Sequence, residues 1–238
     1  MKLVAVVPHY RHITTLPQVI AALKQHGLPV MVVDDGSGES FQSTLQQICA
    51  QENVQLFALP SNGGKGHAMK YGMQEAAAQG FSHVLQIDAD AQHCFTDIPE
   101  LIRLSAATPA ATVCGRPIYG NDAPKARLYG RKITDFWNVV HTWSFHIKDG
   151  MCGFRIYPLA ESCGIIRDSH IGDRMDFDNE ILIHLYWRNV PIIWHDTPVC
   201  YQADGISHFR AWKDNLMISK MHTRLFFKML KWRLGLKP

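Results

Sequence analysis

The sequence predicts an α/β domain with a mainly parallel central sheet flanked by helices, followed by a C-terminal helical extension. Two patterns in residues 1–100 predict the sheet. Short apolar runs alternate with helix-like stretches about four times, which is typical of βαβ units. The loops that follow these runs are rich in Gly, Asp and Asn, and ligands of parallel sheets bind where the strands end. We therefore expect the functional site at the carboxyl edge of the sheet.

Each element is expected from its pattern of apolar residues. Short apolar runs predict buried strands at 3–7, 30–33, 54–59, 84–87 and 111–114. Helical periodicity and glycine stop signals predict helices at 16–26, 40–51, 68–79, 98–107 and 181–187. Residues 125–147 form a mixed stretch of cations and tryptophans, which favours an amphipathic helix.

The composition is that of a globular protein and excludes several classes. The chain has 238 residues, of which 47% are hydrophobic and 19% charged, so a large core is expected. The net charge of +3 is too small to indicate a nucleic-acid partner. The six cysteines include no Cys-x-x-Cys pair, which predicts neither a zinc site nor a disulfide framework and favours a reducing cytosol.

The apolar segments predict a cytoplasmic protein, either soluble or peripheral on the inner face of the cytoplasmic membrane. The first apolar run is short and is broken by Pro8, which is unlike a signal peptide. Uninterrupted apolar stretches stay well below the roughly 18 residues that a membrane-spanning helix needs.

The carboxylate pair after the strand at 84–87 is the strongest candidate site. Alternate residues of an extended chain share a face, so Asp88 and Asp90 can point the same way. Two such carboxylates repel each other unless a cation lies between them, and Mg²⁺ or Mn²⁺ bound to a diphosphate is the usual solution. Taken alone, the short Asp-x-Asp pattern also fits a solvated turn.

Two more loops at the ends of expected strands carry chemistry. Residues 34–37 can offer a carboxylate to a ribose or base, and Gly36 allows a tight turn. Residues 62–66 open a helix, so free backbone N–H groups and Lys65 can meet a phosphate. Their spacing matches neither a Walker A loop nor a dinucleotide fingerprint. A plain turn is the alternative for each loop.

Taken in order, the motifs resemble family-2 glycosyltransferases of the nucleotide-diphospho-sugar (glycosyltransferase-A) fold. The motifs that carry this resemblance are Pro8-x-Tyr10, Asp34-Asp35-Gly36-Ser37, Asn62-x-Gly64-Lys65-Gly66 and Asp88-Ala89-Asp90-Ala91-Gln92-His93. Later motifs are similar to the polyprenyl-phosphate (dolichyl-phosphate) mannosyltransferase branch: Cys114-Gly115-Arg116, the run from Asp149 to Tyr157, Phe177-Asp178-x-Glu180 and Gly205-Ile206-Ser207. The resemblance covers residues 3–210.

The resemblance implies an inverting, metal-dependent glycosyltransferase. It assigns nucleotide-sugar binding to Pro8, Tyr10, Asp34, Asp35, Lys65, Asp88 and Asp90, and the divalent metal, Mg²⁺ or Mn²⁺, to Asp88, Asp90 and Gln92. The donor is GDP-mannose by resemblance to the branch, or a UDP-sugar by frequency in the wider family. The expected acceptor is lipid-linked or a polyprenyl phosphate, and no nucleic acid is expected.

On the acceptor side, the resemblance implies cations that grip a phosphate. The residues assigned there are Arg116, Arg127, Arg131, Arg155, Asp178 and His208. Asp149 or Glu180 is the candidate catalytic carboxylate, although a helix dipole alone also accounts for acids near Glu180. A hydroxyl acceptor needs such a base, whereas a phosphate acceptor is already ionised.

The run 204–208, Asp-Gly-Ile-Ser-His, departs from the branch, which usually has an arginine before its Gly-x-Ser and often a lysine after it. Three readings stay open. His208 and Arg210 take over part of the grip on phosphate, the acceptor differs, or His208 is structural.

The tail predicts a basic amphipathic helix over 212–238 that follows a catalytic domain over 1–211. Apolar residues recur there every three or four positions with lysines and arginines between them. Such a helix lies on an anionic bilayer, or it packs on the domain with a solvated basic face.

Two other functions remain as alternatives. One is a non-catalytic nucleotide-sugar-binding or membrane-adaptor protein, against which the intact carboxylate pair argues. The other is a nucleotidyltransferase, which would carry a Gly-rich basic signature where this chain has Pro-His-Tyr-Arg at 8–11.

Overall fold

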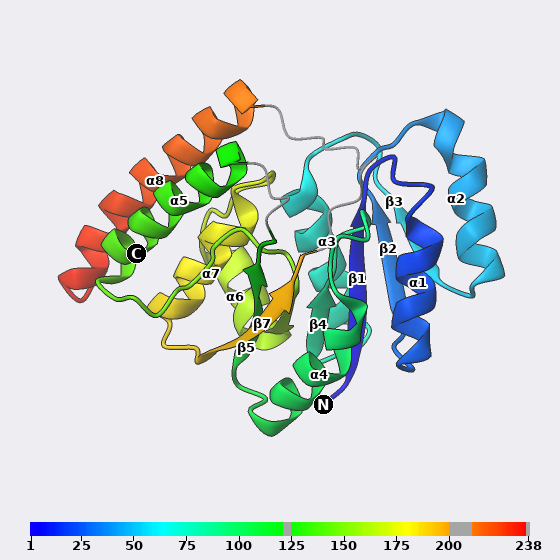
Figure 1. Ribbon diagram of the computed structural model, residues 1–238, viewed down its shortest axis with the longest axis horizontal. Helices are drawn as coiled ribbons and strands as arrows, with labels where there is room; N and C mark the ends of the chain where they lie inside the picture. The colour runs from blue at the N-terminus through cyan, green and yellow to red at the C-terminus, as the bar shows by residue number, and fades with distance from the viewer. Residues whose placement is uncertain (121–124, 200–210, 237–238) are drawn as a thin grey trace.

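The computed structural model describes residues 1–120, 125–199 and 211–236. Within these ranges, helices flank a seven-stranded sheet in the order β3-β2-β1-β4-β6-β5-β7, which confirms the predicted α/β fold (Figure 1). The strands are β1 (Leu3–His9), β2 (Val30–Asp34), β3 (Gln55–Ala58), β4 (His83–Gln86), β5 (Thr112–Ile118), β6 (Arg155–Pro158) and β7 (Ile192–Pro198). The α-helices are α1 (Leu16–Gln25), α2 (Glu39–Gln51), α3 (Lys65–Ala78), α4 (Ile98–Ala107), α5 (Lys125–Thr142), α6 (Leu159–Asp168), α7 (Phe177–Trp187) and α8 (Ala211–Arg233).

The sheet is mainly parallel, as predicted, with one reversed strand. β1 pairs in parallel with β2 and β4, β2 with β3, and β5 with β7. β6 runs antiparallel to both β4 and β5, with Arg155 opposite Gln86. The sequence does not predict β6, because an arginine and a tyrosine interrupt its apolar pattern. Its reversal brings the segment before Arg155 to the carboxyl end of β4.

Two apolar layers cover the sheet because successive residues of each strand face opposite sides. On one side, Ala5 and Val7 of β1 pack in a cluster with residues of α1, α2 and α4. On the other side, Val4 and Val6 pack with residues of α3, α6 and α7. With both faces covered by helices, ligands reach the sheet at its edges, as is usual for parallel sheets.

The predicted C-terminal helix is present as α8, which lies beside α5 at one side of the molecule (Figure 1). Met221, Leu225 and Met229 of α8 are buried in a cluster with residues of α7. His141 of α5 and His222 of α8 are hydrogen-bonded at 3.0 Å in this seam. Burial lowers the pKa of His141 to about 3 and that of His222 to about 4, so both rings are neutral at pH 7.

Two helices begin three or more residues earlier than predicted. α3 starts at Lys65, three residues before the expected Ala68, because the small Gly66 lets the first turn lie against Phe177. α7 starts at Phe177, which places Asp178 and Glu180 in its first turn. None of the helices in the described ranges is long and apolar enough to cross a membrane.

Candidate functional site

The predicted donor residues gather where β1, β2 and β4 end, because these strands are parallel neighbours. Asp34 is the last residue of β2 and is in register with His9, the last residue of β1. Pro8 is the residue before His9, and Tyr10 follows it with the guanidinium of Arg11 4.9 Å from its ring centroid. The fold therefore brings Pro8, Tyr10 and Asp34 to one edge of the sheet.

Asp34 is a buried, ionised carboxylate held by its neighbours. Its Oδ1 lies 2.9 Å from Nδ1 of His9, and its Oδ2 accepts the backbone N–H of Ser37 at 3.1 Å. The Ser37 hydroxyl donates a further hydrogen bond to Oδ1. Burial alone would raise the pKa of Asp34, but the hydrogen bonds from His9 and Ser37 outweigh it and lower the pKa.

Asp35 ties two loops of the site together. Its carboxylate accepts the backbone N–H groups of Gly63 and Gly64 at 2.9 and 2.7 Å. Burial raises the pKa of Asp35 above its ordinary value. Gly36 adopts the predicted tight turn with φ of 66°, and a Cβ there would lie 2.5 Å from the carbonyl carbon of Ser61. The loop at 34–37 thus fixes the loop that opens α3.

The centre of the site is a lysine between two carboxylates. Nζ of Lys65 lies 2.7 Å from Oδ1 of Asp88 and 2.9 Å from Oδ2 of Asp178. The other oxygen of Asp178 accepts Nε2 of Gln86 at 2.7 Å. Burial opposes the charge on both Lys65 and Asp88. Attraction to Asp178 and Asp88 prevails for Lys65 and raises its pKa, whereas attraction to Lys65, together with His93, lowers the pKa of Asp88. Lys65 and Asp88 are therefore both charged at neutral pH.

The Cys-Gly-Phe turn that precedes β6 lies directly against this ion cluster. A Cβ on Gly153 would clash with Nζ of Lys65 and would lie 2.7 Å from Nε2 of Gln86 and 2.9 Å from Oδ1 of Asp88. Only glycine allows the turn to lie this close to the three side chains. The sequence marks Gly153 as part of a motif but gives no sign of what it contacts, because the contact depends on the unpredicted reversal of β6.

Asp149 holds the start of the same turn and links it to α5. Its Oδ1 accepts the backbone N–H groups of Met151 and Cys152 at 2.8 and 2.7 Å, and its Oδ2 forms an ion pair with Arg131. Burial and the nearby charge of Asp149 raise the pKa of Asp135, one turn further along α5, to about 7. The predicted acceptor-side residues Arg131 and Asp149 are therefore direct partners.

The remaining acceptor-side residues are placed differently. Arg155 is fully buried and donates to the backbone carbonyl of Asp178 at 2.5 Å. It therefore helps to hold Asp178, a member of the ion cluster, in place. Arg116 pairs with Asp196 of β7 at the edge of the sheet. Arg127 lies in α5, but its side chain, like the whole of His208, lies outside the described part of the chain.

Glu180 has structural partners on both oxygens. It is 0% exposed, and its Oε1 accepts Nε of Arg224 from α8 at 2.9 Å. Its Oε2 accepts Nη2 of Arg224 at 2.5 Å and the backbone N–H of Gly172 at 2.8 Å. This carboxylate thus joins α7 to α8, and none of these partners belongs to the ion cluster around Lys65.

The residues around Asp88 fit a divalent cation that shares its coordination with phosphate. Asp88 and Asp90 supply hard oxygen donors, and Asp90 accepts the backbone N–H of Gln92 at 3.1 Å. His93, which the sequence analysis did not assign, places Nε2 3.5 Å from Asp88 and stacks on Phe154. In the described ranges, no three His, Cys, Asp or Glu side chains form a complete ligand set. Mg²⁺ commonly takes only one or two carboxylates when a substrate phosphate completes its shell.

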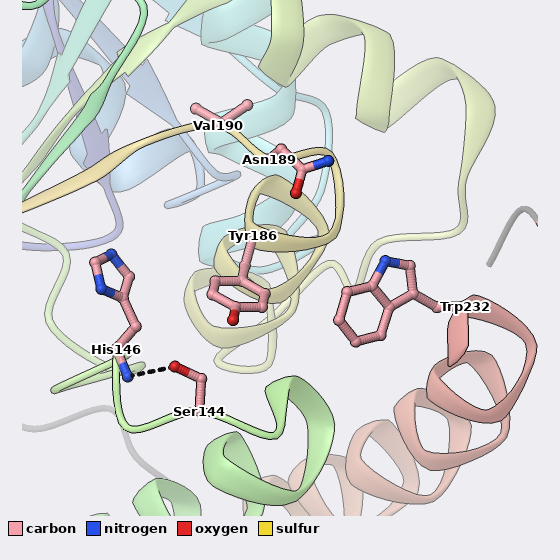
Figure 2. Close-up of a pocket in the computed structure, with 6 residues that line it drawn as sticks. All are labelled: Ser144, His146, Tyr186, Asn189, Val190 and Trp232. Carbon is pink, nitrogen blue, oxygen red and sulfur yellow. Dashed lines mark hydrogen bonds between the residues drawn. The ribbon is translucent and has the colours of Figure 1, made fainter. Parts of the chain in front are cut away.

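A separate hollow of about 340 Å³ lies between the ends of α7 and α8 (Figure 2). Its lining residues are Ser144, His146, Tyr186, Asn189, Val190 and Trp232. It shares no residue with the strand-end cluster and contains neither a carboxylate nor a permanent cation. The strand-end cluster is therefore the candidate active site.

Comparison with known proteins identifies a family for most of the chain. The family model described as Glycosyl transferase family 2 matches residues 4–167. This range contains β1 to β6 and every predicted donor residue. It ends before Asp178 and α8.

Curated relatives extend the similarity. An uncharacterised protein of Methanocaldococcus jannaschii is 24% identical over 232 residues, which cover 94% of this chain and 99% of the relative. Dolichyl-phosphate beta-glucosyltransferases are 27% identical in Dictyostelium discoideum, over 84% of this chain, and 28% identical in Drosophila melanogaster, over 76%. The chain spans only 63% and 62% of the length of these two enzymes.

Solved structures share the fold. Glucosyl-3-phosphoglycerate synthase from Mycobacterium tuberculosis in complex with UDP has a TM-score of 0.66 at 15% identity, over 100% of this chain and 81% of that one. The same enzyme in complex with Mn²⁺ and UDP-glucose has a TM-score of 0.65 at 14% identity, over 100% and 80%. These similarities confirm the predicted nucleotide-diphospho-sugar transferase fold.

Proposed function

We propose, from the premise that this chain belongs to glycosyltransferase family 2, that it transfers a sugar from a nucleotide-diphospho-sugar to a lipid-linked phosphate with inversion at the anomeric carbon. The family match supports the class of reaction. The dolichyl-phosphate beta-glucosyltransferases among its relatives support the class of acceptor.

The relatives favour a UDP-sugar, with UDP-glucose as the first candidate, over GDP-mannose. The curated relatives are named as glucosyltransferases, and the structures of similar fold were solved with UDP or UDP-glucose. In the proposal, the edge formed by Pro8, Tyr10 and the Asp34 loop receives the uridine. Asp34 keeps its charge there because His9 and Ser37 stabilise it.

Asp88 and Asp90, with Gln92 beside them, would hold Mg²⁺ or Mn²⁺ at the diphosphate. When bound, such a cation supplies positive charge that stabilises the departing nucleoside diphosphate. Lys65 keeps Asp88 ionised and holds it against Asp178. Gly153 lets the Cys-Gly-Phe turn pack directly against this group, since any side chain there would meet Lys65 and Asp88.

Within the structure, the observation that supports a phosphate acceptor is that both candidate bases already have hydrogen-bond partners. Both oxygens of Asp149 accept protein N–H groups, and so do both oxygens of Glu180. A hydroxyl acceptor needs a free base to take its proton, whereas a phosphate oxygen attacks without proton transfer. In the proposed step, that oxygen bonds to the anomeric carbon as the bond to the diphosphate breaks, and the electron pair leaves with the nucleotide.

A transfer assay tests this proposal. The protein is incubated with Mn²⁺ and radiolabelled UDP-glucose, and in parallel with labelled GDP-mannose, and is offered polyprenyl phosphate or the matching polyprenol. We expect labelled lipid from UDP-glucose with the phosphate and not with the alcohol. Equal labelling of the polyprenol would contradict the phosphate acceptor, and the absence of transfer to either lipid would contradict the proposed function.

A further inference from the structure

Helix α5 turns its polar side toward the protein. Its buried residues include Thr134, Asn138, His141 and Thr142, with exposed fractions of 4%, 0%, 0% and 2%. His141 bonds to His222, and Thr142 donates to the backbone carbonyl of Asn138 at 2.7 Å. A surface helix normally buries an apolar stripe instead.

The opposite side of α5 is apolar and exposed. Tyr129, Ile133 and Phe136 are 65%, 61% and 63% exposed, and Trp143 just beyond the helix is 66% exposed. Intervals of four and three residues place Tyr129, Ile133 and Phe136 on one line along a helix of 3.6 residues per turn, and Trp143 directly follows the last residue of the helix. Phe145, which follows, is 86% exposed. We call these five residues the α5 stripe.

The charges around the α5 stripe are positive. Lys132 lies beside it with Nζ 6.0 Å from the ring centroid of Tyr129, and the guanidinium of Arg233 lies 4.8 Å from that of Trp143. Lys148 is exposed nearby in the chain. The one acid within α5 is Asp135, and burial together with the charge of Asp149 raises its pKa to about 7.

We propose that the α5 stripe docks on an anionic membrane surface. Exposed Trp and Tyr with flanking cations match the headgroup region of a bilayer, where aromatic rings enter the interface and cations meet lipid phosphates. α5 also carries Arg131 into the candidate site, where it pairs with Asp149. Docking through α5 would therefore hold the candidate site close to the membrane surface, where the phosphate of a lipid-linked acceptor lies. This role for docking rests on the proposed function.

The α8 helix, for which the sequence allows either membrane binding or packing on the domain, is less suited to lead this contact. Its buried face packs on the domain through Met221, Leu225 and Met229. Its exposed face mixes apolar with polar residues, namely Leu216, Phe227 and Leu230 with Ser219, Lys220 and Thr223. The two helices lie side by side, so each can be tested against the other (Figure 1).

The test is co-sedimentation of the whole chain with vesicles, without donor or acceptor. Vesicles of phosphatidylcholine alone are compared with vesicles that also contain phosphatidylglycerol. Variant I133S/F136S should lower the bound fraction on anionic vesicles at least about tenfold, since two large apolar side chains are lost from the contact. The matched variant I133L/F136L should bind like the wild type, and F227S/L230S on α8 should change binding less than I133S/F136S does.

Vesicle co-sedimentation does not depend on sugar transfer. The docking proposal can therefore fail while the proposed function holds, and the reverse. Equal sedimentation of I133S/F136S and wild type would overturn the docking proposal, as would a larger loss from the α8 variant. A dimer in sizing chromatography that I133S/F136S disrupts, with no vesicle binding by the wild type, would assign the stripe to a second copy of the chain instead. Circular dichroism checks that each variant is folded.

Discussion

At the scale of single residues, the candidate site is built around one lysine that forms ion pairs with two carboxylates. Lys65, Asp88 and Asp178 come from the start of α3, the end of β4 and the start of α7. Burying these charges together is tolerable only because each has an opposite partner within hydrogen-bond distance. A donor diphosphate or a cation that enters here meets a network whose charges are already fixed.

Replacing Gly153 with alanine tests whether this network must keep its geometry. The new methyl group would displace Lys65 or Asp88, because its carbon would lie 2.9 Å from Oδ1 of Asp88 and closer still to Nζ of Lys65. We expect kcat/KM for transfer to fall by about 10²-fold, the usual effect of moving reacting groups by about 1 Å. Steady-state kinetics of Gly153→Ala measure this loss.

Gly130→Ala is the matched control, because a Cβ on Gly130 meets no atom within 4 Å. It should keep full activity and a normal thermal midpoint. If Gly153→Ala transfers sugar as fast as this control, the ion cluster is not part of the catalytic site.

The sequence predicts single site residues where they belong to a recognisable motif. It does not predict contacts between residues that are far apart in the chain. Asp34, Lys65 and Asp88 follow predicted strands or open a predicted helix, so their shared edge of the sheet could be inferred. The contact between Gln86 and Asp178 joins residues 92 positions apart, and no local pattern specifies it. The roles of these residues in binding and catalysis stay predictions.

At the scale of elements, one buried ion pair fastens α8 to the domain. Glu180 in α7 is fully buried and binds Arg224 of α8 through two hydrogen bonds. Leaving such a carboxylate without its cation is costly, because a charge remains in the interior. The pair gives Glu180 a structural role that is sufficient to explain an acid at this position.

Replacing Arg224 with alanine should therefore lower the free energy of unfolding by about 3 kcal/mol. This value is at the lower end of the range for a broken buried ion pair, because the Arg224 side chain is partly exposed. Urea unfolding measures the change. Arg103→Ala breaks an exposed pair with Glu100 and should cost less than about 1 kcal/mol. Equal effects of the two substitutions would show that the Glu180 pair is not a structural anchor.

The sequence predicts no element at β6, α6 or β7, and for β6 the physical reason is local. Most predicted strands and helices have regular apolar periods and are present. β6 is four residues long, and the buried Arg155 and Tyr157 within it disguise its period. Because a reversed strand cannot be inferred from local pattern, the position of the Cys-Gly-Phe turn beside Asp88 could not be predicted either.

At the scale of the whole molecule, α5 lies between the candidate site and the surface that we propose for membrane docking. In the proposed function, the sheet edge at β1, β2 and β4 would receive the donor, and α5 would present Arg131, which pairs with Asp149, on the acceptor side. The outward side of α5 is the apolar stripe that we propose for membrane docking. A glycosyltransferase arranged in this way would take a water-soluble donor at the sheet and a lipid-linked acceptor at the bilayer.

In the proposed function, the strand-end cluster binds a nucleotide-sugar together with a divalent cation. A calorimetric titration of UDP-glucose with Mn²⁺, repeated with EDTA, tests this binding on the wild type, on Asp88→Ala and on the control Asp168→Ala, whose carboxylate lies at the exposed end of α6. GDP-mannose, UDP and GDP in parallel identify the base.

We predict metal-dependent binding of UDP-glucose by the wild type and by Asp168→Ala, and none by folded Asp88→Ala or in EDTA. Undiminished binding by Asp88→Ala, or equal binding in EDTA, would contradict this proposal.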